Sequence, residues 1–271
     1  MLKISCVAVT NVGNVRDNNE DNFYVNEEYK KSTLSLNEYY EDSNIRKQYL
    51  YAVCDGMGGE ELGEAASMIA VKTLALYQEA DIKSNIINYI QEANKLICDE
   101  IEKNDGVRMG TTLALLYINE GKAIAYNIGD SRVYLFRKNK LIQLSEDHTQ
   151  AQRLVDLGLL KKSAAANHKD KHKLTQHLGI FPNELIIEPY ESQEINIKQN
   201  DIFLLCSDGL TDMLSDDDIA GILSDKQEGT KALAKKLMEK ALQNGGKDNI
   251  TVVLSKVDMQ ERFWNKFMWE V

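Results

Sequence analysis

The chain has 271 residues, 27% of them charged, and a formal net charge of −10. This length is sufficient for one large domain or two small ones with a substantial apolar core. The excess of acidic residues argues against broad binding to nucleic acid or to an anionic membrane surface, because both are held through many Lys and Arg contacts.

The first part of the chain predicts strands followed by two helices. Strands are expected at residues 3–10, 23–25 and 49–54, and the polar, aperiodic stretch 27–47 is expected to form a hairpin or loop. Ser84 is the predicted N-cap of the second helix. The apolar faces of the two helices comprise Leu62, Ala66, Ile69, Thr73 and Leu76 in the first and Ile86, Ile90, Ala93, Ile97 and Ile101 in the second.

The second part predicts further consecutive strands. Extended segments at 111–118, 122–128 and 132–137 are joined by short turns, which predicts an antiparallel meander. Residues 149–160 are expected to be helical, and the basic, aperiodic segment 161–173 is expected to be a mobile surface segment. The remaining predicted elements are a strand at 201–206, helices at 215–223 and 230–242, and a strand at 250–254. This order favours one α+β domain over a doubly wound parallel sheet.

Four cysteines, Cys6, Cys54, Cys98 and Cys206, lie far apart, and three of them fall in apolar strand-like runs. They are expected to be buried free thiols, since no Cys-x-x-Cys pair indicates zinc. No apolar run approaches the roughly 20 residues of a membrane-spanning helix, and the N-terminal residues show no signal-peptide pattern. These observations predict a reducing, cytoplasmic setting.

Four aspartates lie at turns next to apolar strands. Asp55 and Asp208 each end such a strand and precede a glycine, Asp130 follows Gly129 at the end of another, and Asp248 stands just before a strand. Asp-Gly is also a strong turn signal, so an isolated turn is the alternative at each position. Four such placements favour a shared metal site over unrelated turns, because Asn or Ser often serves equally well in a turn.

Carboxylates without an accompanying His or Cys pair select hard cations, here Mg²⁺ or Mn²⁺. Two such ions roughly 4 Å apart lower the pKa of a shared water and present it to a phosphorus centre. Phosphate monoester hydrolysis is among the slowest uncatalysed reactions, so neutralisation of charge by metals is the chemistry that it most needs. Arg16 stands four residues before Glu20 and is suited to bind phosphate oxygens through its guanidinium group.

Six short motifs, taken in order, carry a family resemblance. They are Val15-Arg16-Asp17-Asn18-Asn19-Glu20-Asp21, Asp55-Gly56-Met57-Gly58-Gly59, Gly110-Thr111-Thr112, Gly129-Asp130-Ser131-Arg132, Ser207-Asp208-Gly209-Leu210 and Asp248-Asn249. Each motif is weak alone, whereas the ordered set resembles the bacterial type of the metal-dependent protein phosphatase 2C (PPM) family. The resemblance spans residues 3–257, so residues 1–257 are predicted to form one catalytic domain.

The resemblance implies a four-layer αββα sandwich, in which helices flank two central antiparallel sheets and a dimetal site lies at one end. It implies that Asp55 bridges two Mn²⁺ or Mg²⁺ ions, that Gly56 offers its carbonyl to one ion, and that Asp208 and Asp248 hold the other. Asp130 would bind a third, weaker ion together with Asp208.

The same resemblance implies further roles around the metals. Besides Asp55, the implied catalytic residues are Glu20 and Asp21, which would order metal-bound waters, and Arg16, which would hold the substrate phosphate. The segment 161–173 matches the flap of the family, which influences substrate choice.

The sequence departs from the family pattern where a proton donor is expected. Met57 stands where animal-type members carry His, and Glu60 stands where bacterial members commonly do. His148 is a candidate acid, although an ordinary hydrogen-bonded loop histidine is the favoured interpretation, and metal-bound water is another donor. The general acid therefore has no assignment.

Two other features have competing interpretations. His168, His172 and His177 stand among lysines, which suggests zinc or a phosphopeptide-binding patch, but their irregular spacing favours a solvated flap. The tail 258–271 carries Phe and Trp residues at helical spacing, which favours a terminal helix packed on its own domain. The alternative for the tail is an apolar contact with a partner, a second copy or a membrane surface.

The sequence thus predicts a Mn²⁺- or Mg²⁺-dependent phosphatase that hydrolyses phosphoserine and phosphothreonine in proteins by metal-activated water. Its expected partners are phosphoproteins produced by a Ser/Thr kinase in the same cell. Two alternatives stay open: a phosphatase of a small phosphorylated metabolite, and a catalytically silent module that binds phosphoproteins. A silent module usually lacks a core aspartate, and here Asp55, Asp208 and Asp248 all stand in place.

Overall fold

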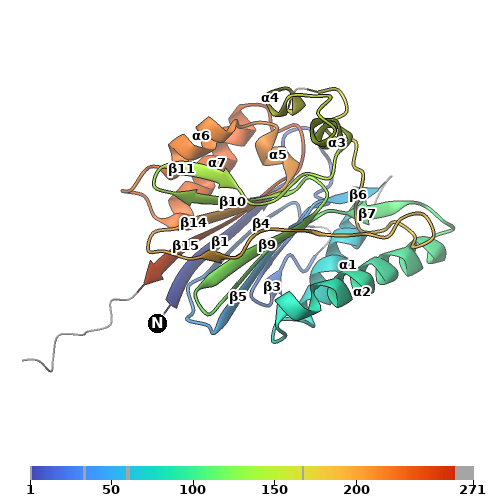
Figure 1. The fold of residues 1–271 in the computed structure, drawn as a ribbon, viewed down its shortest axis with the longest axis horizontal. Coiled ribbons are helices and arrows are strands. Elements are labelled where there is room, and N and C mark those ends of the chain that lie inside the picture. The colour runs from blue at the N-terminus through green and yellow to red at the C-terminus, as the bar shows by residue number, and fades with distance from the viewer. Residues whose placement is uncertain (1, 33–34, 59–61, 167, 260–271) are drawn as a thin grey trace, which may run out of the picture.

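The computed structural model describes residues 2–32, 35–58, 62–166 and 168–259, which form four layers in the order helix, sheet, sheet, helix (Figure 1). This confirms the predicted α+β sandwich with two central antiparallel sheets. No helix within these ranges is long and apolar enough to cross a membrane. All four cysteines are free and buried, as predicted.

The first sheet has six strands in the spatial order β11-β10-β14-β15-β1-β4. Its strands are β1 (Leu2–Asn11), β4 (Asn37–Asp42), β10 (Arg132–Arg137), β11 (Lys140–Gln143), β14 (Ile202–Cys206) and β15 (Ile250–Met259). β1 and β15 pair along their whole length, from Leu2 opposite Met259 to Asn11 opposite Ile250. Because β1 is this long, β15 continues to Met259 and does not end at residue 254 as predicted.

The second sheet has the order β12-β9-β8-β5-β2-β3, and β13 also pairs with β9. Its strands are β2 (Asn22–Val25), β3 (Glu28–Tyr29), β5 (Gln48–Cys54), β8 (Leu113–Asn119), β9 (Lys122–Ile128), β12 (Tyr190–Glu191) and β13 (Ile195–Asn196). A separate small pair joins β6 (Gly56–Gly58) to β7 (Met109–Thr111). The stretch 27–47 therefore supplies one strand to each large sheet.

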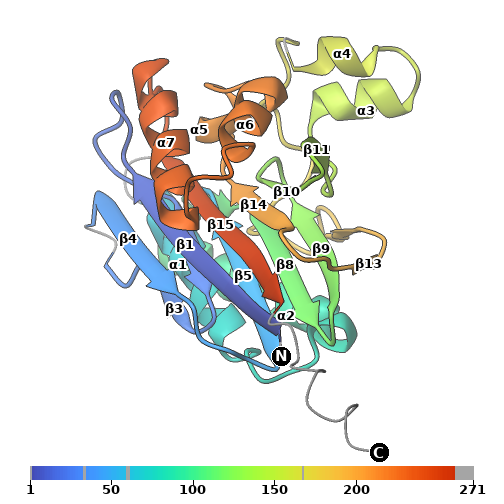
Figure 2. The ribbon, with the colours of Figure 1, turned by 90° about the vertical axis from the view of Figure 1, so that its left-hand side faces the viewer.

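Helices cover the outer faces of both sheets. α1 (Gly63–Ala75) and α2 (Ile82–Lys103) pack on the second sheet, and α5 (Asp208–Thr211), α6 (Asp216–Leu223) and α7 (Thr230–Gln243) pack on the first. Between the sheets lies a third apolar cluster, to which both contribute alternate residues of their strands. Figure 2 shows α3 (Gln150–Asp156) and α4 (Lys162–Ala165) standing away from the sandwich. The predicted flap, 161–173, contains α4.

The predicted meander is wrong at its third strand. β8 and β9 pair in the second sheet, but β10 crosses to the first sheet, where it pairs with β14 and β11. The turn at Gly129 makes this crossing with a φ of +93°, and a Cβ there would lie 2.7 Å from Thr112 Cγ2. Asp130 consequently lies in a turn that joins the two sheets.

The predicted N-cap of the second helix is also wrong. α2 begins at Ile82, after Asp81, and the Ser84 hydroxyl donates a hydrogen bond to Asp81 Oδ2 at 2.7 Å. Ile82 is fully buried, so the apolar stripe begins one turn earlier than the sequence interpretation placed it. Two other predictions, on Glu60 and on residues 260–271 of the tail, lie outside the described residues.

Candidate metal centre

The four aspartates of the sequence motifs lie at one end of the sandwich, where their charges interact. Asp55 follows β5, Asp208 follows β14, Asp248 lies just before β15, and Asp130 lies between β9 and β10. Burial, together with the negative charges of Asp21 and the other three, raises the pKa of Asp55 well above its usual range. The fold thus brings together carboxylates that are far apart in sequence.

The backbone of Asp55 is fixed on both sides. Its N–H donates to Thr112 Oγ1 at 3.0 Å, and its carbonyl accepts from the Thr112 N–H and the Thr111 hydroxyl, both at 2.9 Å. The Thr112 hydroxyl lies 2.7 Å from Ser131 Oγ, next to Asp130. These hydrogen bonds fix the turns of Asp55 and Asp130 relative to each other. They give the two threonines of the Gly-Thr-Thr motif a structural role next to both aspartates.

Gly56 lies at a close approach of three backbone segments. A Cβ on Gly56 would lie 2.2 Å from the Gly63 carbonyl oxygen and 2.5 Å from that of Glu20, so no side chain fits. The Ser67 hydroxyl donates to the same Glu20 carbonyl at 2.6 Å. Burial first, and then the nearby charge of Glu64, raises the pKa of the Glu20 carboxyl to about 7. Glu20 therefore lies beside Gly56 in a largely negative surrounding.

Asp21 is fully buried and ties two strand ends together. Its Oδ2 accepts hydrogen bonds from the Ser207 and Thr251 hydroxyls, both at 2.7 Å. Its Oδ1 is buried and has no hydrogen-bond partner among the described residues. Burial raises the pKa of Asp21 to about 6. The free oxygen is an acceptor that a water or a cation would satisfy.

Arg16 and Asp248 contact each other at the mouth of the site. Arg16 Nη2 lies 2.7 Å from Asp248 Oδ2, and the Arg16 side chain is 55% exposed. Asn249 holds the N-terminal loop against this turn, because its Oδ1 accepts from the Glu20 N–H at 2.8 Å and its Nδ2 donates to the Asn18 carbonyl at 2.8 Å. The Asp248-Asn249 motif thus combines an acidic side chain with a loop anchor.

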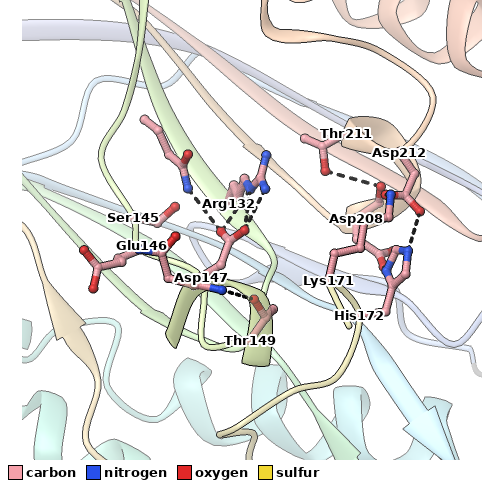
Figure 3. A network of polar contacts seen from close by, with 12 residues as sticks. Arg132, Ser145, Glu146, Asp147, Thr149, Lys171, His172, Asp208, Thr211 and Asp212 are labelled. Carbon is pink, nitrogen blue, oxygen red and sulfur yellow. Dashed lines mark hydrogen bonds and ion pairs between the residues drawn. The ribbon is translucent and has the colours of Figure 1, made fainter. Parts of the chain in front are cut away.

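The predicted flap meets this end of the sandwich at His172. Its Nδ1 lies 3.3 Å from Asp208 Oδ2 and its Nε2 lies 3.3 Å from Asp212 Oδ2, while Lys171 Nζ contacts Asp212 Oδ1 at 2.8 Å (Figure 3). Ligand atoms of Asp130, His172 and Asp208 all lie within 4.8 Å of one another. The hydrogen bond to Asp208 raises the pKa of His172. These groups line a cavity of about 300 Å³.

An ion pair forms the opposite wall of that cavity. The Arg132 guanidinium contacts the Asp147 carboxylate through Nε at 2.9 and 3.1 Å and through Nη2 at 2.6 Å (Figure 3). Arg132 Nη1 also donates to the Tyr134 hydroxyl at 3.0 Å. Because the pair is partly buried and bidentate, it fixes the loop before α3 against β10.

The donor set fits divalent cations that prefer oxygen ligands. In the described part of the chain, the ion pairs made by these clustered aspartates are Arg16 with Asp248 and His172 with Asp208. Several carboxylates are thus gathered with few positive partners, and Asp21 Oδ1 has no hydrogen-bond partner among the described residues. Mg²⁺ and Mn²⁺ bind such oxygen-rich sites, and their charge offsets the mutual repulsion.

All of the predicted metal and catalytic residues within the described ranges lie at this end of the molecule. His148, His168 and His177 make local hydrogen bonds outside the aspartate cluster. His148 Nδ1 accepts from the Gly129 N–H at 3.3 Å, which agrees with a hydrogen-bonded loop histidine, and burial lowers its pKa. His168 Nδ1 accepts from the Asp170 N–H at 3.2 Å, and His177 Nδ1 lies 2.8 Å from the Leu178 carbonyl. His168, His172 and His177 therefore contact different groups and do not form a joint site.

Sequence reasoning missed the roles of Asn249, Asp212 and His172 in this arrangement. Asn249 and Asp212 each had a local signal, since one is part of a motif and the other follows Asp208 by one helical turn. For His172 the sequence offered only its place in a basic segment. Its contact with Asp208 depends on how the segment after α4 packs against the end of the first sheet.

Comparison with known proteins gives consistent matches. The family model for protein phosphatase 2C matches residues 39–245. The serine/threonine phosphatase stp of Listeria welshimeri is 33% identical over 265 residues, which cover 93% of this chain and 96% of the relative. The serine/threonine protein phosphatase PstP of Mycobacterium tuberculosis is 33% identical over 222 residues, which cover 80% of this chain and 42% of PstP.

Solved structures give the same result. The crystal structure of Mycobacterium tuberculosis PstP/Ppp superimposes with a TM-score of 0.78 at 30% identity, over 95% of this chain and 100% of that chain. The catalytic domain of PstP in complex with two manganese ions gives a TM-score of 0.76 at 31% identity, over 96% of this chain and 100% of that chain. From its sequence, its fold and its cluster of aspartates, the chain belongs to the protein phosphatase 2C family.

Proposed function

We propose that the chain, a metal-dependent serine/threonine phosphatase, releases phosphate from phosphoserine and phosphothreonine in proteins by direct attack of water. The observation that carries this proposal is the cluster around Asp55, where carboxylates from both sheets meet beside an exposed arginine. Bound Mn²⁺ or Mg²⁺ would lower the pKa of a water and neutralise phosphate charge. Asp55, the Gly56 carbonyl, Asp208 and Asp248 would hold two ions, and Asp130 with Asp208 a third.

The side chains around the metals have distinct proposed tasks. Arg16 would bind the phosphate oxygens, because its guanidinium is exposed at the mouth and only its Nη2 contacts Asp248. Asp21 would accept a hydrogen bond from a water through its free Oδ1. Glu20 lies next to Gly56 and would orient a second water. These groups position water and phosphate without forming a bond to phosphorus.

The hydroxyl and thiol groups at the site support attack by water over attack by a side chain. Ser207 donates its hydroxyl to Asp21, and the Thr112 and Ser131 hydroxyls bond to each other. Cys54 and Cys206 are fully buried, and burial raises the pKa of both thiols, that of Cys206 to about 12. A thiolate nucleophile is therefore not available at neutral pH.

The cavity and the cysteines bear on the substrate class and the cellular setting. Residues of the flap form one wall of the cavity beside Asp208, and the cavity is not enclosed, which suits a phosphorylated segment of a protein more than a small metabolite. The natural substrates would be products of a Ser/Thr kinase in the same cell. Four buried free cysteines support a reducing, cytoplasmic setting.

Removal of metal is expected to reduce turnover at least about 10³-fold, since several kcal/mol of transition-state stabilisation would be lost. The measurement is phosphate release from an aryl phosphate and from a phosphothreonine peptide, first with Mn²⁺, then with chelator, then with Mn²⁺ restored. Turnover that survives chelation would contradict the metal-dependent mechanism. Turnover of the aryl phosphate without the peptide would favour a small substrate, and phosphoprotein binding without turnover would favour a silent module.

A chain that stops after Met259 is expected to keep full aryl-phosphate turnover. The residues proposed for the site lie between Arg16 and Asp248, and the domain is proposed to comprise residues 1–257. The matched comparison is a chain that stops after Val253, which loses more than half of β15 and therefore the partners of residues 2–7 of β1. That shorter chain is expected not to fold. A large loss of turnover in the Met259 variant would show that the tail supports the active fold.

A further inference from the structure

His172 lies where a cation ligand would lie, although it comes from the flap. One ring nitrogen of His172, a carboxylate oxygen of Asp208 and one of Asp130 lie within 4.8 Å of one another, which leaves room for one ion between them. His172 Nδ1 is 3.3 Å from Asp208 Oδ2. The same two aspartates are the ones proposed above for a third ion. The imidazole is the one nitrogen ligand in that group.

The second nitrogen of His172 has the partner that a ligating histidine usually has. Nε2 lies 3.3 Å from Asp212 Oδ2. Metal-bound histidines commonly donate their other ring N–H to a carboxylate, which fixes the tautomer and the ring orientation. Nδ1 hydrogen-bonds to Asp208, and a cation held there would take the place of the Nδ1 proton, while the proton on Nε2 would stay directed at Asp212.

Asp212 is itself held in place by two contacts. Its backbone N–H donates to the Asp208 carbonyl at 2.8 Å, and its Oδ1 contacts Lys171 Nζ at 2.8 Å (Figure 3). The Lys173 carbonyl accepts from the Gln150 N–H at 2.8 Å, so the backbone next to His172 is anchored to the start of α3. The His172 ring is thus held by Asp212, and the backbone next to it is held by Gln150.

We propose that His172 is a nitrogen ligand of a divalent cation held by Asp130 and Asp208, and that it makes this position selective for Mn²⁺ over Mg²⁺. The inference rests on the proposed function, because it concerns the third ion of that site. Imidazole nitrogen suits transition-metal ions, whereas Mg²⁺ prefers oxygen ligands and retains its waters. A cation here would join the flap to the ends of both sheets.

The inference predicts a nitrogen signature that oxygen ligands cannot give. Wild-type protein loaded with Mn²⁺ is expected to show imidazole nitrogen modulation in pulsed electron paramagnetic resonance, and His172→Ala is expected to abolish it. Mn²⁺ titration should show the weakest site of His172→Ala weakened at least about 10-fold, with Mg²⁺ affinity there changed less than about 3-fold. Asp212→Asn should weaken Mn²⁺ at that site while keeping the nitrogen signal.

His168→Ala is the matched control, because His168 lies in the same flap but bonds to Asp170 and not to the carboxylate cluster. It is expected to behave as the wild type. Absence of nitrogen modulation in fully loaded wild type, or equal Mn²⁺ affinity in the two variants, would overturn the inference. Chelator-sensitive turnover without a nitrogen signal would overturn the inference and leave the proposed function standing. A nitrogen signal without turnover would support the ligand and overturn the function.

Discussion

Replacing Asp55 with Asn is expected to reduce phosphate release at least about 10³-fold, which corresponds to about 4 kcal/mol of transition-state stabilisation. The charges of Asp21, Asp208, Asp130 and Asp248 all raise the pKa of Asp55, so Asp55 lies among these carboxylates, and it is the residue proposed to contact both ions. An amide keeps the size of the side chain and removes its charge. Affinity for two of the ions should fall together, because one shared ligand is lost.

The same substitution is expected to leave the metal-free protein at least as stable as the wild type. Burial and the neighbouring carboxylates disfavour a charged Asp55 in the absence of metal, and Asn removes that cost. The measurement pairs turnover with thermal unfolding in chelator. Asp217→Asn, an exposed position in the first turn of α6, removes an equal charge and should change neither quantity by much. Substantial metal-dependent turnover by Asp55→Asn would contradict the assignment of Asp55.

Replacing Gly209 with Ala is expected to destabilise the fold by about 3 kcal/mol, because it overpacks a rigid contact between two backbones. A Cβ on Gly209 would lie 1.9 Å from the Asn249 carbonyl oxygen. Gly209 follows Asp208, and Asn249 follows Asp248. Relief of the clash therefore moves apart the two turns that carry the proposed ligands of one ion. Metal affinity and turnover should both fall.

Gly221→Ala provides the matched control for that prediction. Gly221 lies within α6, and a Cβ there would meet no atom within 4 Å. Alanine inside a helix is favoured over glycine by roughly 0.5–1 kcal/mol, so this variant should unfold at a slightly higher temperature. Gly209→Ala should unfold about 6–12 °C below the wild type, given the usual dependence of melting temperature on stability for a chain of this size. Equal melting temperatures for the two variants would refute the steric argument.

Much of the fold follows from local patterns in the sequence. The strands around Asp55 and Asp208 are apolar runs bounded by glycine, and such signals depend only on nearby residues. The crossing of the chain from one sheet to the other at Gly129 cannot be predicted from local patterns. A short turn between two apolar strands has the same sequence pattern whether it closes a hairpin or joins two sheets. Its outcome depends on β14, which is far away in sequence and pairs with β10.

The candidate site divides in the same way. The clustering of the aspartates was predictable because each stands at a turn next to a strand, where a carboxylate suits both turn geometry and metal binding. The contact of His172 with Asp208 was not, because it joins the flap to a strand end through tertiary packing. Asn249 is an intermediate case, since its motif was noted but the loop that it anchors was not.

The pairing of β1 with β15 has a consequence for the order in which the protein folds. The first sheet needs β15 between β1 and β14, so its hydrogen bonding cannot be completed until the chain has been synthesised through Met259. Such contacts between distant residues close slowly, because the loop between them loses much entropy. Asp208 follows β14 and Asp248 precedes β15, so both lie at one end of the β14–β15 pair. A nascent chain should therefore complete its metal-binding end late and remain inactive on the ribosome.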